Sequence, residues 1–194
     1  MVLEFREVTR SYGATRALDA ASFALEPGTL TVVAGDNGAG KTTLLRLAAL
    51  LERPTSGAVH GVTRERLAWL GQEPGLYDEL TVRENLAFYA RFFGRDAEVV
   101  AAATTFSIAP KLDVRARHLS RGEKQRAALA RALLGGALMV LDEPTSALDA
   151  DAGAACVAML SGLRGARTML VATHDAELVK RADRVLRLDQ GRLV

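Results

Sequence analysis

The residues best able to do chemistry in this chain form one short run, residues 35–42, with the sequence GDNGAGKT. This run fits the pattern G-x-x-x-x-G-K-[ST] of a phosphate-binding loop. Glycines let such a loop curl so that backbone N–H groups point at phosphate oxygens, while the lysine reaches the outer phosphates and the hydroxyl ligates Mg²⁺. We therefore expect a nucleoside triphosphate and Mg²⁺ to bind here, at Gly35, Asp36, Asn37, Gly38, Ala39, Gly40, Lys41, Thr42 and Thr43.

A strand and a helix must flank this loop if it is to bind phosphate. Residues 30–34 (LTVVA) form an apolar run that predicts a buried strand, and residues 43–51 carry leucines at a spacing that predicts a helix. The loop then delivers phosphates to the helix N-terminus, where the dipole favours anions. The alternative reading, a glycine-rich turn without a ligand, is disfavoured by this context.

Polar side chains follow two later apolar runs of the chain. Asp142 and Glu143 come after residues 137–141, and His174 comes shortly after residues 168–172. Continuous apolar runs are typical of parallel strands buried on both faces, and ligands gather at the carboxyl edge of such a sheet. An acidic pair at this edge favours a metal ion and an activated water over the alternative of a solvated strand-end turn or helix cap.

The remaining pattern predicts the elements that position these residues. Residues 2–8 predict an edge strand that pairs with residues 17–24, and residues 58–60 and 67–71 predict two further strands. Thr81 and Glu84 have capping-box spacing, so a helix is expected from there to Phe93. We expect an α/β fold with a mostly parallel core sheet, an N-terminal antiparallel β layer and an inserted α-helical sub-lobe at about residues 73–120, with a loop around residues 109–110.

Length and composition set limits on the class of protein. The chain has 194 residues, enough for a single domain over residues 1–194. Its net charge of +2, with both signs interspersed, does not predict nucleic acid as a partner. Cys156 is the single cysteine, so an internal disulfide is excluded. Because no leader or membrane-spanning run is evident, we expect a cytoplasmic protein whose membrane role, if any, comes through a partner.

Further residues in a fixed order carry a resemblance that covers nearly the whole chain. Tyr12, Gln72, residues 119–123 (LSRGE), Asp142 with Glu143, residues 146–149 (SALD) and His174 follow one another as in ATP-binding cassette ATPases. The chain therefore resembles the ATP-driven motor subunits of ABC transporters. The resemblance implies that Tyr12 stacks on adenine, that Gln72 contacts Mg²⁺ or water, and that Ser146 and Asp149 belong to the D-loop.

The segment LSRGE departs from the usual signature L-S-G-G-Q of this family. Arg121 replaces a glycine and Glu123 replaces the glutamine, whereas Ser120 and Gly122 are retained. Ser120 and Glu123 also have capping-box spacing, so the segment is expected to open a helix that runs to residues 135–136. The resemblance implies that Ser120, Arg121, Gly122 and Glu123 face the γ-phosphate bound by another subunit. The added cation and the added anion have opposite electrostatic effects there.

The mechanism implied by the resemblance is phosphoryl transfer from ATP to water. Lys41 balances developing charge, Thr42, Gln72 and Asp142 hold Mg²⁺, Glu143 orients or deprotonates the water, and His174 contacts the γ-phosphate. Two ATP-binding subunits then work head to tail; we expect a homodimer, and a heterodimer stays open. They act on a transmembrane permease subunit held by the surface of residues 72–93, at the cytoplasmic face of the membrane.

Two other kinds of ABC ATPase act without a membrane channel. The DNA-repair or chromosome-maintenance kind needs a long coiled-coil insertion, and the segment between Lys41 and Ser120 is too short for one. The translation or iron–sulfur-assembly kind stays open as an alternative. Among transporters, the short segment after His174 favours a minimal exporter subunit, resembling those of haem export and cytochrome c maturation more than those of drug or lipid export.

Overall fold

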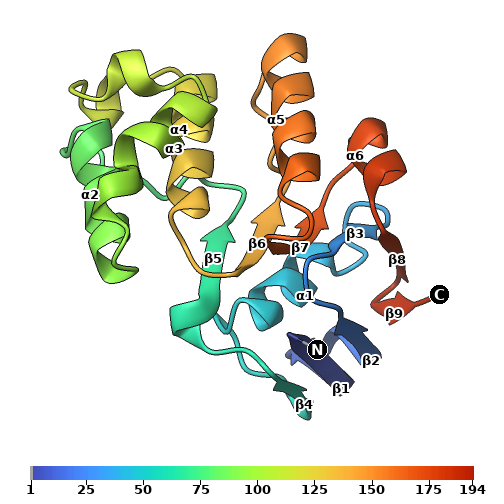
Figure 1. The fold of residues 1–194 in the computed structure, drawn as a ribbon. Helices are drawn as coiled ribbons and strands as arrows, with labels where there is room; N and C mark the ends of the chain where they lie inside the picture. Colours follow the sequence, from blue (N-terminus) through green and yellow to red (C-terminus); the bar gives the residue numbers. More distant parts are fainter. Residues whose placement is uncertain (1) are drawn as a thin grey trace.

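The computed structural model describes residues 2–194, and its larger sheet is built from six strands (Figure 1). Their order across the sheet is β5-β6-β7-β3-β8-β9. Among the strands of the described residues, only β9 runs antiparallel to its neighbour in this sheet, so the prediction of a mostly parallel core sheet is confirmed. The strands are β3 (Leu30–Ala34), β5 (Leu67–Leu70), β6 (Leu138–Asp142), β7 (Thr168–Ala172), β8 (Arg184–Asp189) and β9 (Arg192–Leu193).

The smaller sheet is the antiparallel layer, formed by β1 (Leu3–Tyr12), β2 (Thr15–Leu25) and β4 (Ser56–His60). Its order is β2-β1-β4, so the prediction that the first strand lies at an edge is wrong. β4 pairs with the free side of β1, with Phe5 opposite Val59. The short sequence of β4 has no apolar alternation, and its place depends on pairing with a distant segment.

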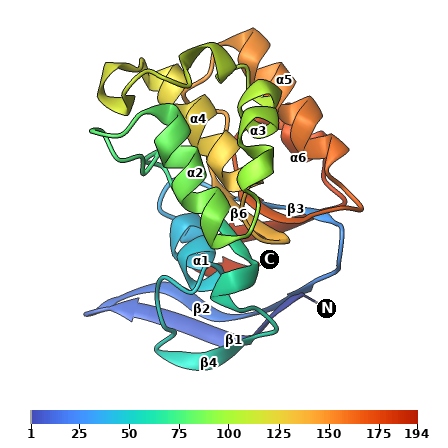
Figure 2. The same ribbon diagram turned by 60° about the vertical axis from the view of Figure 1, so that its left-hand side comes forward.

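Helix α1 (Lys41–Ala48) lies between the two sheets (Figure 2). It begins two residues earlier and ends three residues earlier than the leucine pattern predicts. Beyond it the chain turns at Leu50, whose φ of 55° is left-handed and cannot continue a helix. Side chains alternate between the two faces of the parallel sheet, as its pleat requires. Leu138 and Val140 of β6 pack in the core around α1, whereas Met139 and Leu141 pack in the core under the other helices.

The other helices cover the opposite face of the parallel sheet (Figure 2). They are α2 (Val82–Phe92), α3 (Val99–Thr105), α4 (Arg121–Leu133), α5 (Ala150–Gly162) and α6 (Ala176–Arg181). Both predicted capping boxes are confirmed, at Thr81 with Glu84 and at Ser120 with Glu123. The segment around Ala109 forms a 3₁₀ turn rather than an open loop. No helix within residues 2–194 has the length and apolarity needed to cross a membrane.

Candidate functional site

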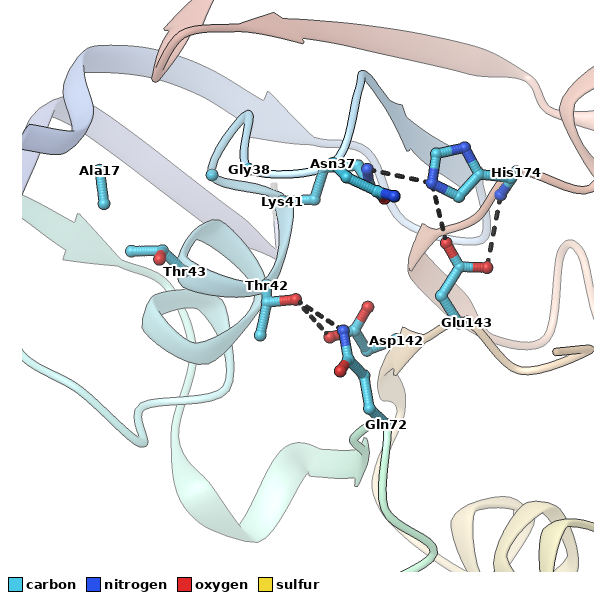
Figure 3. A pocket seen from close by; sticks show the side chains of 11 residues that line it. Ala17, Asn37, Gly38, Lys41, Thr42, Thr43, Gln72, Asp142, Glu143 and His174 are labelled. Carbon is cyan, nitrogen blue, oxygen red and sulfur yellow. Dashed lines mark hydrogen bonds and ion pairs between the residues drawn. The ribbon is translucent and has the colours of Figure 1, made fainter. Parts of the chain in front are cut away.

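A cavity of about 270 Å³ lies beyond the carboxyl ends of β3, β6 and β7 (Figure 3). These three strands are neighbours in the sheet, so the segments that follow them meet there. Ten of the residues expected at the site line this cavity, together with Ala17 of β2. The ten are Asn37, Gly38, Gly40, Lys41, Thr42, Thr43, Gln72, Asp142, Glu143 and His174.

The phosphate loop depends on glycine where it meets β2. Gly40 precedes α1 with a φ of 104°, and a Cβ there would lie 2.3 Å from the carbonyl oxygen of Ala17. Only glycine fits this conformation and this close approach. Directly after it, Lys41 is 8% exposed, and its Nζ donates to the carbonyl oxygens of Gly35 at 2.6 Å and Asp36 at 2.9 Å. The loop therefore holds the ammonium group beside the cavity with its own backbone.

Three oxygen-bearing side chains meet on one side of the cavity (Figure 3). The hydroxyl of Thr42 donates to Asp142 Oδ2 at 2.7 Å, and the amide of Gln72 donates to Thr42 Oγ1 at 3.3 Å. Asp142 is 1% exposed, and this burial raises the pKa of its carboxyl group above the usual value despite the hydrogen bond from Thr42. A divalent cation beside this carboxylate would offset the cost of its burial.

This oxygen set fits Mg²⁺ bound together with a nucleotide. The described residues contain no group of three or more His, Cys, Asp or Glu side chains that could hold a metal ion. Mg²⁺ is commonly held by one or two carboxylates, phosphate oxygens and water, rather than by a cage of protein ligands. One buried carboxylate, one hydroxyl and one amide beside a phosphate loop match that preference.

On the other side of the cavity, Lys41, Glu143 and His174 form a second cluster (Figure 3). His174 Nε2 lies 3.3 Å from Lys41 Nζ and 3.5 Å from Glu143 Oε1. The ammonium can only donate, so its contact requires Nε2 to be unprotonated, and an unprotonated Nε2 cannot donate to Glu143. Nε2 of His174 can therefore hydrogen-bond to either Lys41 or Glu143, but not to both at once.

The backbone fixes the direction of the Glu143 side chain. Glu143 has a φ of 50°, a left-handed conformation that is uncommon outside glycine. Its N–H donates to the carbonyl oxygen of Ala172 at 2.8 Å, and its Oε2 accepts from the backbone N–H of His174 at 3.4 Å. The turn after β6 is thus tied to the end of β7, and the carboxylate lies at the edge of the cavity.

Tyr12 does not line the cavity. The residue is 43% exposed, the guanidinium carbon of Arg10 lies 4.5 Å from its ring centroid, and its hydroxyl bonds to Glu52. One ring face is therefore covered by Arg10. Gly35, Asp36 and Ala39 also stay out of the lining, and the first two contribute the carbonyls that hold Lys41.

The LSRGE segment and the SALD segment lie side by side, and neither lines the cavity. A Cβ on Gly122 would lie 3.2 Å from the carbonyl oxygen of Ala147, and the buried amide of Gln125 donates to the carbonyl oxygen of Pro144 at 2.9 Å. Ser146 is exposed, and the side chain of Asp149 caps α5 by accepting from the N–H of Ala152 at 2.8 Å.

The carboxylate of Glu123 is engaged by groups at the start of its helix and in the preceding segment. Its carboxylate accepts from the N–H of Ser120 at 2.8 Å and pairs with Lys111 at 3.2 Å. The backbone hydrogen bond from Ser120 is the main cause that lowers the pKa of Glu123. Arg121 is exposed at the start of α4. The anion introduced by Glu123 is therefore partly neutralised, whereas the cation of Arg121 faces solvent.

Sequence reasoning missed Ala17, because a small apolar side chain in a strand carries no chemical signal. It reaches the site through its backbone, against Gly40. It also missed Arg131, a buried arginine of α4 whose guanidinium donates to the backbone on both sides of Gln72. Nothing in the alanine-rich sequence of α4 distinguishes this arginine from its neighbours.

Comparisons with known proteins agree with this geometry. A family model described as ABC transporter matches residues 18–146. The cytochrome c biogenesis ATP-binding export protein CcmA of Ruegeria pomeroyi is 38% identical over 190 residues, which cover 92% of this chain and 90% of that protein. The mycobactin import ATP-binding/permease protein IrtB of Mycolicibacterium smegmatis is 37% identical over 216 residues, which cover 99% of this chain and 37% of that larger protein.

Two solved structures are similar over nearly the whole chain. A bacterial Atm1-family ABC exporter with ATP bound has a TM-score of 0.87 at 30% identity, and the match covers 99% of this chain and 37% of that one. A dimeric bacterial ABC transporter cassette has a TM-score of 0.92 at 24% identity, with 98% of this chain and 96% of that one covered. The second match shows a shared fold.

Proposed function

The chain belongs to the ABC transporter family as one of its ATP-hydrolysing subunits, and from this premise we propose that it powers export through a separate permease subunit. The observation that carries the proposal is the meeting of a phosphate loop, a buried carboxylate and a Glu143–His174 pair in one cavity. This is the set of groups that transfer of a phosphoryl group to water requires. Residues 1–194 then form one ATP-binding domain, with a helical sub-lobe at about residues 73–120.

In this proposal the phosphates of ATP enter the cavity beside the loop of residues 35–43. Thr42, Gln72 and Asp142 would hold Mg²⁺, which supplies positive charge against the phosphate oxygens when bound. The support is the oxygen cluster at Thr42 and the burial of Asp142. Tyr12 would stack on adenine with the ring face that Arg10 leaves uncovered.

Lys41, Glu143 and His174 would act on the reacting groups. Lys41 exchanges the carbonyls of Gly35 and Asp36 for phosphate oxygens, which are stronger acceptors for an ammonium group. Glu143 then orients the attacking water and takes its proton, since its carboxylate already lies at the cavity edge. When Lys41 turns to phosphate, Nε2 of His174 is released to contact the γ-phosphate.

We also place two copies of the chain head to tail around each ATP. Ser120, Arg121, Gly122 and Glu123 would face the γ-phosphate held by the other copy, with Ser146 and Asp149 of the D-loop beside them. The support is that both segments lie together and stay out of their own chain's cavity. The start of α4 also offers unpaired N–H groups and the exposed Arg121 to an anion.

The permease subunit would dock on the surface formed by residues 72–93. Tyr77, Phe88 and Phe92 are 50%, 57% and 67% exposed there, and Tyr89 and Phe93 line an adjoining groove with Trp69. Exposed aromatic side chains that gather in one place mark a protein-binding surface. The subunit would then be peripheral on the cytoplasmic face of the membrane, without a role in binding nucleic acid.

For the cargo, we propose haem export for cytochrome c maturation. The support is that CcmA matches this chain along 90% of its length, whereas ATP-binding/permease relatives such as IrtB match along 37%. Deleting the gene from its host and staining for haem-bound c-type cytochromes tests the proposal. We expect their loss, and restoration by the unaltered gene but not by a Lys41→Ala copy. Normal cytochrome levels in the deletion strain would refute this cargo.

A further inference from the structure

Arg131 clamps the segment that carries Gln72. The residue is 6% exposed in the last turn of α4. Its Nη2 donates to the carbonyl oxygen of Trp69 at 3.2 Å, and its Nη1 donates to the carbonyl oxygen of Gly75. Its guanidinium carbon lies 4.8 Å from the ring centroid of Tyr89 in α2. Trp69 and Gly75 lie three residues before and three residues after Gln72, so one planar group holds both sides of this turn.

The backbone of this turn has few hydrogen bonds of its own, although the Leu76 side chain packs against the core. Within the described chain, residues 72–76 make no backbone–backbone hydrogen bond. Gly75 has a φ of 62°, and a Cβ there would lie 3.2 Å from Nη1 of Arg131, so the turn closes tightly on the guanidinium. Segments without backbone hydrogen bonds open at low free-energy cost unless side chains fix them. Arg131 is the side chain that hydrogen-bonds to the backbone of this turn.

Burying this arginine is costly, which argues for a specific role. The loss of solvation lowers the pKa of Arg131, and its charge is met by carbonyl dipoles and the face of Tyr89 rather than by a close ion pair. A methionine or leucine would fill the same space between α4 and β5 without that cost. What such a residue would lose is the pair of hydrogen bonds across the Gln72 turn.

We infer that Arg131 is a positioning residue for the ATPase reaction: by bridging Trp69 and Gly75 it holds Gln72 where its amide reaches Thr42. This inference rests on the proposed role of Gln72 beside Mg²⁺ and water. Arg131 also belongs to α4, the helix that begins at the LSRGE segment. The position of Gln72 is therefore tied to that of the signature helix.

The first test reads the turn without nucleotide. Trp69 is the single tryptophan of the chain, and its indole Cζ2 lies 3.1 Å from where a Cβ of Gly71 would be, so its fluorescence reports this turn. In Arg131→Met we expect a red-shifted emission and stronger quenching by acrylamide. The matched control is Arg95→Met, because Arg95 donates to the carbonyls of Leu133 and Gly135 at the end of the same helix and not to the turn. Equal emission in both variants would overturn the inference.

The second test asks whether Arg131 acts through Gln72. Arg131→Met should lower turnover and raise the Mg²⁺ concentration for half-maximal activity by about tenfold, the scale for a lost supporting contact. In a Gln72→Ala background the same substitution should change turnover by less than about twofold, because coupled residues are not additive. Full additivity of the two effects would overturn the inference. If Gln72→Ala itself leaves turnover unchanged, the proposed role of Gln72 is wrong, and Trp69 fluorescence still decides whether Arg131 holds the turn.

Arg131→Lys is the milder variant in case Arg131→Met does not fold. It retains the positive charge and loses the planar fork that reaches two carbonyls. We expect its turnover and Trp69 emission to fall between those of the wild type and Arg131→Met. Wild-type turnover and wild-type Trp69 emission in Arg131→Lys would contradict the inference that the two hydrogen bonds of Arg131 hold the Gln72 turn.

Discussion

At the scale of single residues, the site stores unfavourable electrostatics that its ligands can relieve. Asp142 is a buried carboxylate with a raised pKa, and Lys41 is a buried ammonium held by carbonyls. Each group is less stable in the ligand-free protein than it would be beside a cation or a phosphate. The buried carboxylate of Asp142 therefore lowers the stability of the ligand-free fold, and substituting it separates stability from activity.

Asp142→Asn should stabilise the ligand-free protein at neutral pH while abolishing Mg²⁺-dependent ATP hydrolysis. Because the folded pKa of Asp142 is raised above 3.8, the native state binds its proton more tightly than the unfolded state does. The protonated carboxyl of Asp142 therefore adds to the free energy of unfolding at low pH, and this contribution is lost as the pH rises through the folded pKa. At pH 7 the ionised carboxylate destabilises the ligand-free fold. Asparagine removes that cost and can still accept the hydrogen bond from Thr42.

Thermal unfolding at neutral pH and at about pH 4 checks this prediction. The midpoint of Asp142→Asn should exceed that of the wild type at neutral pH, and the difference should shrink in acid. Asp189→Asn, at an exposed carboxylate, is the control and should show no such gain. A lower unfolding midpoint for Asp142→Asn than for the wild type at neutral pH would show that the buried carboxylate does not destabilise the ligand-free fold.

Lys41→Ala should lose ATP affinity while remaining folded. The lost charge-assisted contacts to phosphate are worth roughly 2 to 3 kcal/mol, or about two decades in dissociation constant. Titration calorimetry with Mg²⁺ and ATP measures this, with Lys180→Ala as a control because Lys180 is exposed and paired with Glu177. Near-normal ATP affinity in Lys41→Ala would show that Lys41 does not bind the phosphates.

At the scale of elements, both ends of α4 are fixed by side chains. Ser120 and Glu123 form a reciprocal cap at its start. At its end, Arg95 and Arg167 donate to the carbonyl oxygens of the last turn and of Gly135. Cations at a helix C-terminus satisfy free carbonyls and oppose the dipole. The helix is thus held as a rigid unit between the signature segment and the Gln72 turn.

Arg167→Met should destabilise the fold and leave ATP binding intact. Arg167 donates to Gly135 at 2.9 Å and to Leu133 at 3.2 Å, and hydrogen bonds from a charged donor contribute about 1.5 to 3 kcal/mol. Urea unfolding should show a loss of that order, with the KM for ATP unchanged. Arg187→Met, at an exposed arginine, should lose less than about 0.5 kcal/mol. Equal stability of the two variants would show that the cap of α4 contributes nothing.

The elements also show how far the sequence could predict the structure. The strands β6 and β7 were predictable because continuous apolar runs need burial on both faces. The pairing of β4 with β1, and with it the central place of β1, was not, since both depend on contact between distant segments. In the site, residues with reactive side chains could be identified from type and spacing. Ala17 and Arg131 could not, because they act through backbone contacts that only the folded chain creates.

At the scale of the whole molecule, the proposed reaction needs two copies of the chain. In the proposed arrangement one copy would supply the cavity with Lys41, Asp142 and Glu143, and the other would supply the LSRGE segment, which lies outside its own cavity. The chain alone should therefore hydrolyse ATP poorly, and its activity should rise with protein concentration. Closure of two copies on ATP and their separation after hydrolysis would provide the movement that a permease subunit uses.

The most direct test of this account is to measure ATP binding, turnover and dimerisation together in Glu143→Gln. Glutamine keeps the size and hydrogen bonding of Glu143 but removes the basic carboxylate. We predict near-normal ATP affinity, turnover lowered by at least about a hundredfold, and an ATP-bound dimer that accumulates in light scattering, whereas the wild type forms it only transiently. Wild-type turnover, or a loss of ATP affinity as large as that of Lys41→Ala, would contradict the assignment of Glu143 as the group that acts on water.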